Sequence, residues 1–298
     1  MAANGWFCEH VVSSLQKLYP QAAIFGGVTG QHLGIGKNSI FYPPDPESEG
    51  SIAILALRGN VPIHCVVSRG VESLTPPFTV LPSAHPSSTS ANPASTSLAT
   101  SLLLPRTVDV SELVDEKGVR HSPRNAINTF ALQLRTRRIA TSSVVIGTGT
   151  SPSGPFILKE IDMEHLIHHN SDRLTFQLDD GEEPPTHVAF FALTAAACEE
   201  DIARAMRDAK QRFVSRGEEV IGCVMFSCSE RGPLPSQRFF AKEALDANSY
   251  CEVFPKAPLI GSYCGGEIGP RAMAGISAET IFRTGNATVC AFVFYYIL

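Results

Sequence analysis

A segment of sixteen residues near the N-terminus recurs near the C-terminus, and this repeat constrains the fold of the 298-residue chain more than any other feature. Residues 19–34 read YPQAAIFGGVTGQHLG and residues 254–269 read FPKAPLIGSYCGGEIG. Aligned without gaps, the two segments share five identities, where ordinary residue frequencies would give about one. Two unrelated strand-and-turn segments would be a simpler explanation. The number of identities favours two related half-domains instead.

Three of the five identities are glycine pairs, namely Gly26/Gly261, Gly30/Gly265 and Gly34/Gly269. Glycine at matching positions suits a positive φ angle or a close approach of two backbones. We therefore expect these glycines to be structural and to lie where the two halves meet. Only the C-terminal copy has a buried strand (220–228) ahead of its helix, so the first half is expected to be about one strand short, with an open sheet edge.

Apolar residues follow both the helical and the strand period, which predicts an α+β protein. We expect two pseudo-equivalent halves, each a largely antiparallel sheet with helices on its outer face. Helices are expected at 7–18, 126–138, 199–214 and around 238–248. Strands are expected at 22–25, 51–57, 61–68 (as a hairpin partner of 51–57), 174–178, 187–193, 220–228, 259–263 and 287–298.

The clearest boundary is compositional. From Ser73 to Pro105 the chain has no Asp, Glu, Lys or Arg, and residues 82–101 are mostly Ser, Thr, Ala and Pro. Such a stretch cannot bury enough apolar surface to offset its conformational entropy, which indicates a flexible spacer rather than a recognition element. We therefore divide the chain into a shortened first half (1–81), an insertion (82–106) and a C-terminal domain (107–298).

Composition and charge exclude several classes of protein. A chain that is 44% hydrophobic and 18% charged is globular, and a net charge of -5 argues against a nucleic-acid partner. The run Ala287–Leu298 is too short for a membrane helix, which needs about 20 residues, and the first residues lack a signal-peptide pattern. Eight cysteines without a C-x-x-C pair indicate buried thiols in a reducing compartment, so we expect a cytoplasmic or nuclear protein without a membrane partner.

Two segments at strand ends carry candidate binding residues. A thiol beside an arginine can have a lowered pKa, but no signature places a histidine near Cys228, so we predict no catalytic residue and no enzyme. A reactive thiol and a purely structural thiol stay open as alternatives. Glu267 is expected either to stabilise a turn, by pairing with Arg231, or to face a ligand or partner. The candidate ligand- or partner-binding residues are Cys228, Glu230, Arg231, Gly232, Cys264, Gly266 and Glu267.

Three further patterns are weaker. The glycines of 147–154 lack the Gly-Lys-Ser/Thr ending of a phosphate-binding loop. His165, His168 and His169 have no further ligand at metal-site spacing, so we predict no metal and no cofactor. The cluster formed by Arg135 and residues 137–138 is typical of a solvated helix end.

An apolar strand ending in Phe-x-Cys-x-x-Arg-Gly, followed after a helix by Phe-Pro-x-x-Pro-Leu-x-Gly and Gly-Glu-Ile-Gly, resembles the FIST family of F-box and intracellular signal transduction proteins. The resemblance covers a C-terminal FIST domain at 107–298 and a shortened N-terminal one at 1–81. The residues that carry it are Phe226, Cys228, Arg231, Gly232, Phe254, Pro255, Pro258, Gly261, Gly266, Glu267, Ile268 and Gly269.

The resemblance implies a function. Eukaryotic members usually join this module to an F-box that docks on Skp1 in a cullin-RING ubiquitin ligase, while the FIST part holds the protein substrate. Bacterial members resemble sensory modules for small ligands. We expect a non-catalytic recognition module of an SCF-type ligase adaptor, acting in ubiquitin-dependent protein catabolism, with a small-ligand sensor in signal transduction as the alternative. No F-box is recognisable in the chain, so a Skp1/cullin contact is expected only if one is encoded upstream; an enzymatic role would rest on Cys228 alone.

Overall fold

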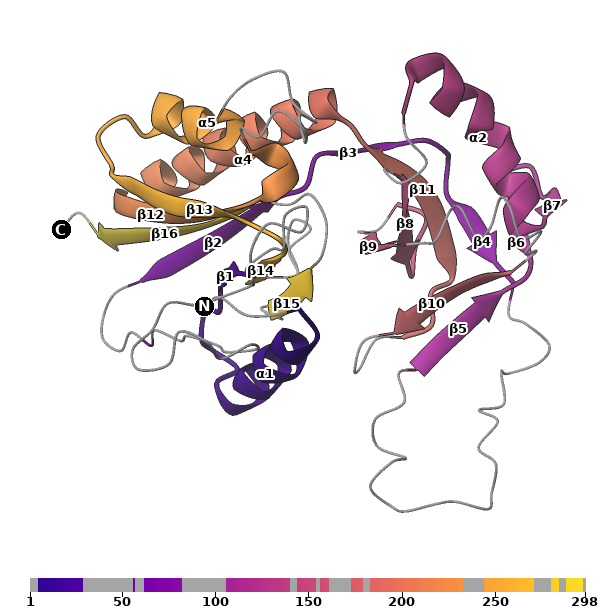
Figure 1. The fold of residues 1–298 in the computed structure, drawn as a ribbon, viewed down its shortest axis with the longest axis horizontal. Coiled ribbons are helices and arrows are strands. Elements are labelled where there is room, and N and C mark those ends of the chain that lie inside the picture. Colours follow the sequence, from indigo (N-terminus) through magenta and orange to yellow (C-terminus); the bar gives the residue numbers. More distant parts are fainter. Residues whose placement is uncertain are drawn as a thin grey trace, which may run out of the picture. The chain divides into compact units, whose positions relative to one another are not determined.

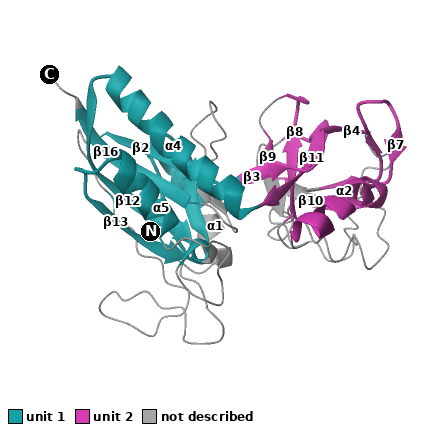
Figure 2. Cartoon of the chain, turned by 90° about the horizontal axis from the view of Figure 1, so that it is seen from above, with its two compact units in different colours: residues 1–70, 194–298 teal, residues 71–193 magenta. Residues whose placement is uncertain are grey.

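The chain folds into two compact units (Figure 2), residues 1–70 with 194–298 and residues 71–193. The computed structural model describes residues 5–28, 56, 62–81, 106–139, 144–153, 156–160, 173–178, 183–232, 244–270, 280–283 and 288–296. Several expectations fall outside these residues: Gly30, Gly34, the strand 51–57, the insertion 82–101 and the three histidines His165, His168 and His169.

A mainly antiparallel sheet forms the framework of unit 1. Its described strands run in the order β13-β12-β16-β2, with β12 parallel to β13 and every other neighbour antiparallel. Helices α4 and α5 cover one face of this sheet (Figure 1). The bounds are β2 (Ile63–Ser68), α4 (Ala195–Ser215), β12 (Glu218–Cys228), α5 (Leu245–Val253), β13 (Leu259–Cys264) and β16 (Thr288–Tyr296).

Helix α4 begins where a side chain caps it and lies on the sheet by its apolar stripe. Thr194 accepts a hydrogen bond from the Ala197 N–H, which satisfies one of the unpaired donors of the first turn. The buried stripe Ile202, Met206 and Phe213 recurs at helical spacing and packs against Phe292 and Phe294 of β16. The expected start at Glu199 was therefore four residues late, because the cap and not the acidic residues marks the first turn.

The two copies of the repeat pair with each other on the other side of this sheet. Here α1 (Gly5–Leu18), β1 (Gly26–Gly27), β14 (Glu267–Pro270) and β15 (Thr280–Arg283) form a small layer. Gly26 lies opposite Ile268, Gly27 lies opposite Glu267, and the Val28 N–H donates to the Gly266 carbonyl. The repeat segments do meet, as expected, but both copies belong to unit 1. The helices α1 and α5 also end at equivalent positions, directly before the two segments.

Unit 2 places helix α2 (Pro123–Arg137) on the core of a second antiparallel sheet. Its described strands run in the order β7-β6-β4-β11-β8-β9, β3 also pairs with β11, and β5 pairs with β10. The rings of Phe130 in α2 and Phe190 in β11 lie 5.0 Å apart in the centre of the core. The bounds are β3 (Val71–Ser73), β4 (Phe78–Val80), β5 (Arg106–Val110), β6 (Leu113–Val114), β7 (Arg120–His121), β8 (Val144–Gly149), β9 (Ile157–Glu160), β10 (Leu174–Leu178) and β11 (His187–Leu193).

The expected α+β class with largely antiparallel sheets is confirmed. Residues 22–25 do not form a strand, because the ladder with β14 begins only at Gly26. The strand expected at 61–68 is β2, and it pairs with β16. The helix expected around 238–248 is α5, which begins seven residues later, at Leu245. The two units group the chain by spatial contact, so the boundaries at residues 82 and 107 stay a prediction.

Candidate functional site

Arg231 lies at the centre of unit 1, with a side chain that is 0% exposed. It ends the 3₁₀ turn η2 (Ser229–Arg231), which follows directly on the strand β12. A buried guanidinium is costly unless it is paired and hydrogen-bonded, so its surroundings determine what this segment can do.

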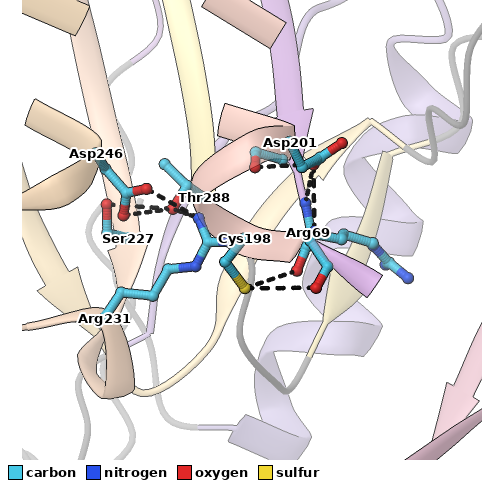
Figure 3. Close-up of polar contacts among 9 residues, drawn as sticks. Arg69, Cys198, Asp201, Ser227, Arg231, Asp246 and Thr288 are labelled. Atoms are coloured by element: carbon cyan, nitrogen blue, oxygen red, sulfur yellow. Dashed lines mark hydrogen bonds and ion pairs between the residues drawn. The ribbon is translucent and has the colours of Figure 1, made fainter. Parts of the chain in front are cut away.

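A network of three side chains compensates that charge. The Arg231 Nη1 donates to the Asp246 carboxylate over 2.9 Å and to the Thr288 hydroxyl over 2.7 Å. The Thr288 hydroxyl in turn donates to the other oxygen of Asp246 over 2.8 Å. The Ser227 hydroxyl lies 3.4 Å from the Thr288 hydroxyl. Figure 3 shows these side chains converging from β12, η2, α5 and β16. The network therefore ties four elements of unit 1 together.

Cys198, in the first turns of α4, lies beside Arg231 and is completely buried. Its Sγ is 3.5 Å from the carbonyl oxygens of Arg69 and Gly70. Burial raises the pKa of the Cys198 thiol, and the charge and hydrogen bond of Arg231, which favour the thiolate, do not overcome it. The pKa of Arg231 is itself raised, since Asp246 and Cys198 outweigh the opposing effect of burial. The pair thus holds a neutral thiol next to a charged guanidinium.

The turn that leaves β2 is bound to α4 by one carboxylate (Figure 3). Asp201 accepts hydrogen bonds from the Ser68 hydroxyl over 2.9 Å and from the Arg69 and Gly70 N–H groups over 2.8 and 3.2 Å. Gly70 has φ +65°, and a Cβ there would lie well under 3.0 Å from the backbone of Cys198. Only glycine fits this turn against the start of α4.

The second predicted segment forms its own buried cluster. Glu267 lies in β14 and is 1% exposed. Burial and the negative charge of Glu267 raise the pKa of the Cys264 thiol, and the hydrogen bond from Ser262 lowers it by less. A Cβ on Gly27 would lie well under 3.0 Å from the Cys264 Sγ, and one on Gly269 would clash with Val289. Close approach, not a positive φ, thus explains two of the predicted glycines, Gly269 and Gly261, whose Cβ would meet the Met225 carbonyl, and also Gly27, which the repeat did not single out.

Gly265 is a further glycine that the repeat predicted to be structural. It is exposed in the bend between β13 and β14, and among the described glycines a positive φ occurs only at Gly70, Gly118 and Gly217. Its N–H donates to the Val28 carbonyl over 2.8 Å, a bond that any residue except proline can make. A positive φ is therefore not the reason for glycine at position 265, its observed contact is a backbone bond to the other copy of the repeat, and its structural role stays a prediction.

The structure buries most of the predicted site residues instead of displaying them. Cys228, Arg231, Cys264, Gly266 and Glu267 are all buried. Asp246, which the motifs did not suggest, pairs with Arg231, and the two readings of Glu267, as a turn-stabilising or a ligand-facing carboxylate, stay predictions. Gly232 is half-buried, where a Cβ would crowd the Ser229 carbonyl and the Tyr263 ring; the side chain of Glu230 lies outside the described residues. Their role in binding stays a prediction.

Sequence reasoning missed four members of these clusters: Cys198, Asp201, Asp246 and Thr288. Asp246 carried one usable signal, since a carboxylate in the first turn of a helix interacts favourably with the helix dipole. The other three are ordinary residues of a helix or strand, and only the fold brings them to Arg231 and to the turn after β2.

Neither a metal centre nor a phosphate loop emerges from the described part of the chain. No group of His, Cys, Asp and Glu among those residues could hold a metal ion. Gly147 and Gly149 lie at the end of β8, whose antiparallel partner is the strand β9 (Ile157–Glu160). The seven cysteines whose side chains are described are free thiols, and none of the described helices is long and apolar enough to span a membrane.

Comparison with protein families identifies the middle of the chain. Residues 148–270 match the FIST C domain. This domain is associated with signal transduction, and the match includes β12, Arg231 and the glycine-rich segment through β14. It lies within the span 107–298 that the motifs suggested for this domain. No curated protein matches the chain.

Proposed function

We propose that the chain is a non-catalytic recognition module, the substrate-binding part of an SCF-type ubiquitin-ligase adaptor. Its motifs resemble those of F-box only protein 22, a FIST protein, and the proposal extends that likeness to function. Its partner would then be a protein substrate destined for ubiquitination and proteasomal degradation, in the cytoplasm or nucleus.

The observation that carries the proposal is the FIST C match together with the burial of its motif. Cys228 is 5% exposed, Cys198 is fully buried, and the pKa of Cys198 is raised by burial, so neither thiol is presented as a nucleophile to a substrate. The residues of this motif are buried in ion pairs and close backbone contacts. This favours a role as a rigid framework for binding over a role as a reaction centre.

Affinity purification tests the adaptor role. The tagged chain and the longest product encoded at the same locus are expressed side by side in cells of the source organism, with a proteasome inhibitor. We expect Skp1 and a cullin with the longer product only if it encodes an F-box, and the same substrate protein with both. Recovery of neither ligase component with a product that does contain an F-box would contradict the proposal.

A small-ligand sensor is the second candidate, because the FIST C domain is associated with signal transduction. A ligand that binds only the folded state raises the melting temperature, by linkage. Thermal-shift screening of the purified chain with amino acids, nucleotides and organic acids therefore separates the two: a saturable shift favours the sensor, and no shift favours protein recognition.

A further inference from the structure

Among the described residues, one side of the backbone of strand β13 has no pairing partner at the edge of the unit 1 sheet. In the described residues β13 pairs only with β12, in parallel. The Cys223 N–H donates to the Pro258 carbonyl, and groups two residues apart along a strand point the same way. The backbone groups of Ile260 and Ser262 therefore point toward β12, and those of Leu259, Gly261 and Tyr263 point outward.

Besides β12, the turn η2 and the strand β1 contact β13 among the described elements, but most of the strand stays exposed. The four consecutive residues from Ile260 to Tyr263 are exposed, with Ile260 at 72% and Tyr263 at 41%. Natural proteins protect a free edge with charges, prolines or bulges, because its open N–H and C=O groups pair readily with another strand. From Ala257 to Gly266 the chain has no Asp, Glu, Lys or Arg, and no proline interrupts β13. The edge thus lacks the usual protection.

The chemistry of the edge specifies its occupant. Regularly spaced outward N–H and C=O groups fit only an extended backbone, and the exposed Ile260 favours apolar side chains beside it. Lys256, just before the strand, is exposed and has no ion pair among the described residues. In an antiparallel arrangement the C-terminal end of the guest strand would reach Lys256, where a carboxylate would be favoured.

We propose that β13 binds an extended, apolar segment of a partner protein as an additional antiparallel strand, with an acidic residue at the C-terminal end of that segment. This inference rests on the proposed function and gives the recognition module its contact surface. Leu259, Gly261 and Tyr263 supply the hydrogen bonds, and Ile260 supplies the side-chain contact.

The test uses the purified full chain and an acetylated, amidated peptide of alternating valine and threonine that ends in aspartate. In the free protein we expect fast amide exchange at Gly261 and Tyr263 and slower exchange at Ile260 and Ser262, because only the latter point toward β12. Excess peptide should slow exchange at Gly261 and Tyr263 by about ten-fold or more. A peptide ending in lysine should bind about three-fold more weakly.

Two variants provide a matched comparison. Ile260→Lys places a charge on the edge without touching the ladder with β12, and should weaken peptide binding by about ten-fold. Leu132→Lys is its control, because Leu132 is 73% exposed on helix α2 of unit 2. The urea midpoint of each variant, read from Trp6 in α1, confirms that unit 1 is folded.

Three results would overturn the proposal. The first is unchanged exchange at Gly261 and Tyr263 in excess peptide, and the second is equal weakening by both variants. The third is slower exchange when the protein concentration alone is raised, which would assign the edge to a second copy of the chain. The experiment contains no ligase component, so its failure is distinct from a failure to recover Skp1 and a cullin.

Discussion

Replacing Arg231 by methionine should destabilise unit 1 far more than replacing the whole ion pair by apolar residues. The guanidinium and the Asp246 carboxylate are 0% and 2% exposed and 2.9 Å apart. Removing one partner of such a pair costs about 3–5 kcal/mol, because the other charge stays buried without compensation. Asp246 keeps the Thr288 hydroxyl and the dipole of α5, the latter worth about 0.3–1 kcal/mol, so we expect about 3 kcal/mol for Arg231→Met.

The double variant Arg231→Met/Asp246→Leu removes both charges together. Well-packed apolar replacements of buried ion pairs are often neutral, so the double variant should lie within about 2 kcal/mol of the wild type. Asp246→Leu alone should cost about as much as Arg231→Met alone, which makes the coupling energy of the cycle at least about 4 kcal/mol in magnitude.

Urea unfolding measures the three variants. The only tryptophan of the chain, Trp6, lies in α1 and therefore reports on unit 1. The midpoint and the m value of each transition give the free energy of unfolding. If Arg231→Met cost less than about 1 kcal/mol, or if the double variant lost the sum of the two single losses, the network would not hold unit 1 together as described.

Three more predictions concern other parts of the two units. Burial and the charges of Arg212 in α4 and Arg216 directly after it lower the pKa of His64 to about 4, so the neutral ring is favoured in the fold. Stability present above pH 6.5 should fall by about 1–2 kcal/mol toward pH 4, allowing for partial exposure, and His64→Phe should lose that part of the pH dependence in urea unfolding. Gly261→Ala should cost about 3 kcal/mol by forcing β13 from β12, whereas Gly222→Ala, with only ordinary contacts, should change stability by less than about 1 kcal/mol; equal urea midpoints would contradict this. Arg138→Gly should increase the free energy of unfolding by about 0.5–1 kcal/mol, because Arg138 has φ 55° at the end of α2 and glycine adopts this angle without strain. Calorimetry should show this as a higher Tm.

Elements with a local apolar pattern could be predicted from the sequence. The strands 174–178 and 187–193 have the expected bounds, and the apolar stripe of α4 lies on the core as expected. The errors occur where the defining interaction is not local. β1 exists only through its ladder with β14, and the start of α5 follows Ala244, which offers no capping side chain.

The candidate site divides in the same way. Arg231 and Glu267 stood out as charges among apolar residues and glycines, and both are buried in unit 1. Their surroundings were not predictable, because Asp246 and Thr288 come from a helix and a strand whose packing decides which side chains meet. A pattern can reveal a charge that needs a partner, but the partner is chosen by the fold.

The burial of the motif shifts the search for specificity to other residues. Arg231, Glu267 and the glycines that identify the FIST C segment hold β12, β14 and α5 in place, so a substitution there changes stability and binding together. The edge of β13 belongs to the same segment, and in the described part of the chain its residues Ile260 to Tyr263 are exposed. Substitutions at Ile260 should therefore change binding while the unfolding midpoint stays constant. A substitution scan that measures the binding affinity and the unfolding midpoint at each position separates residues that stabilise the fold from residues that contact the partner.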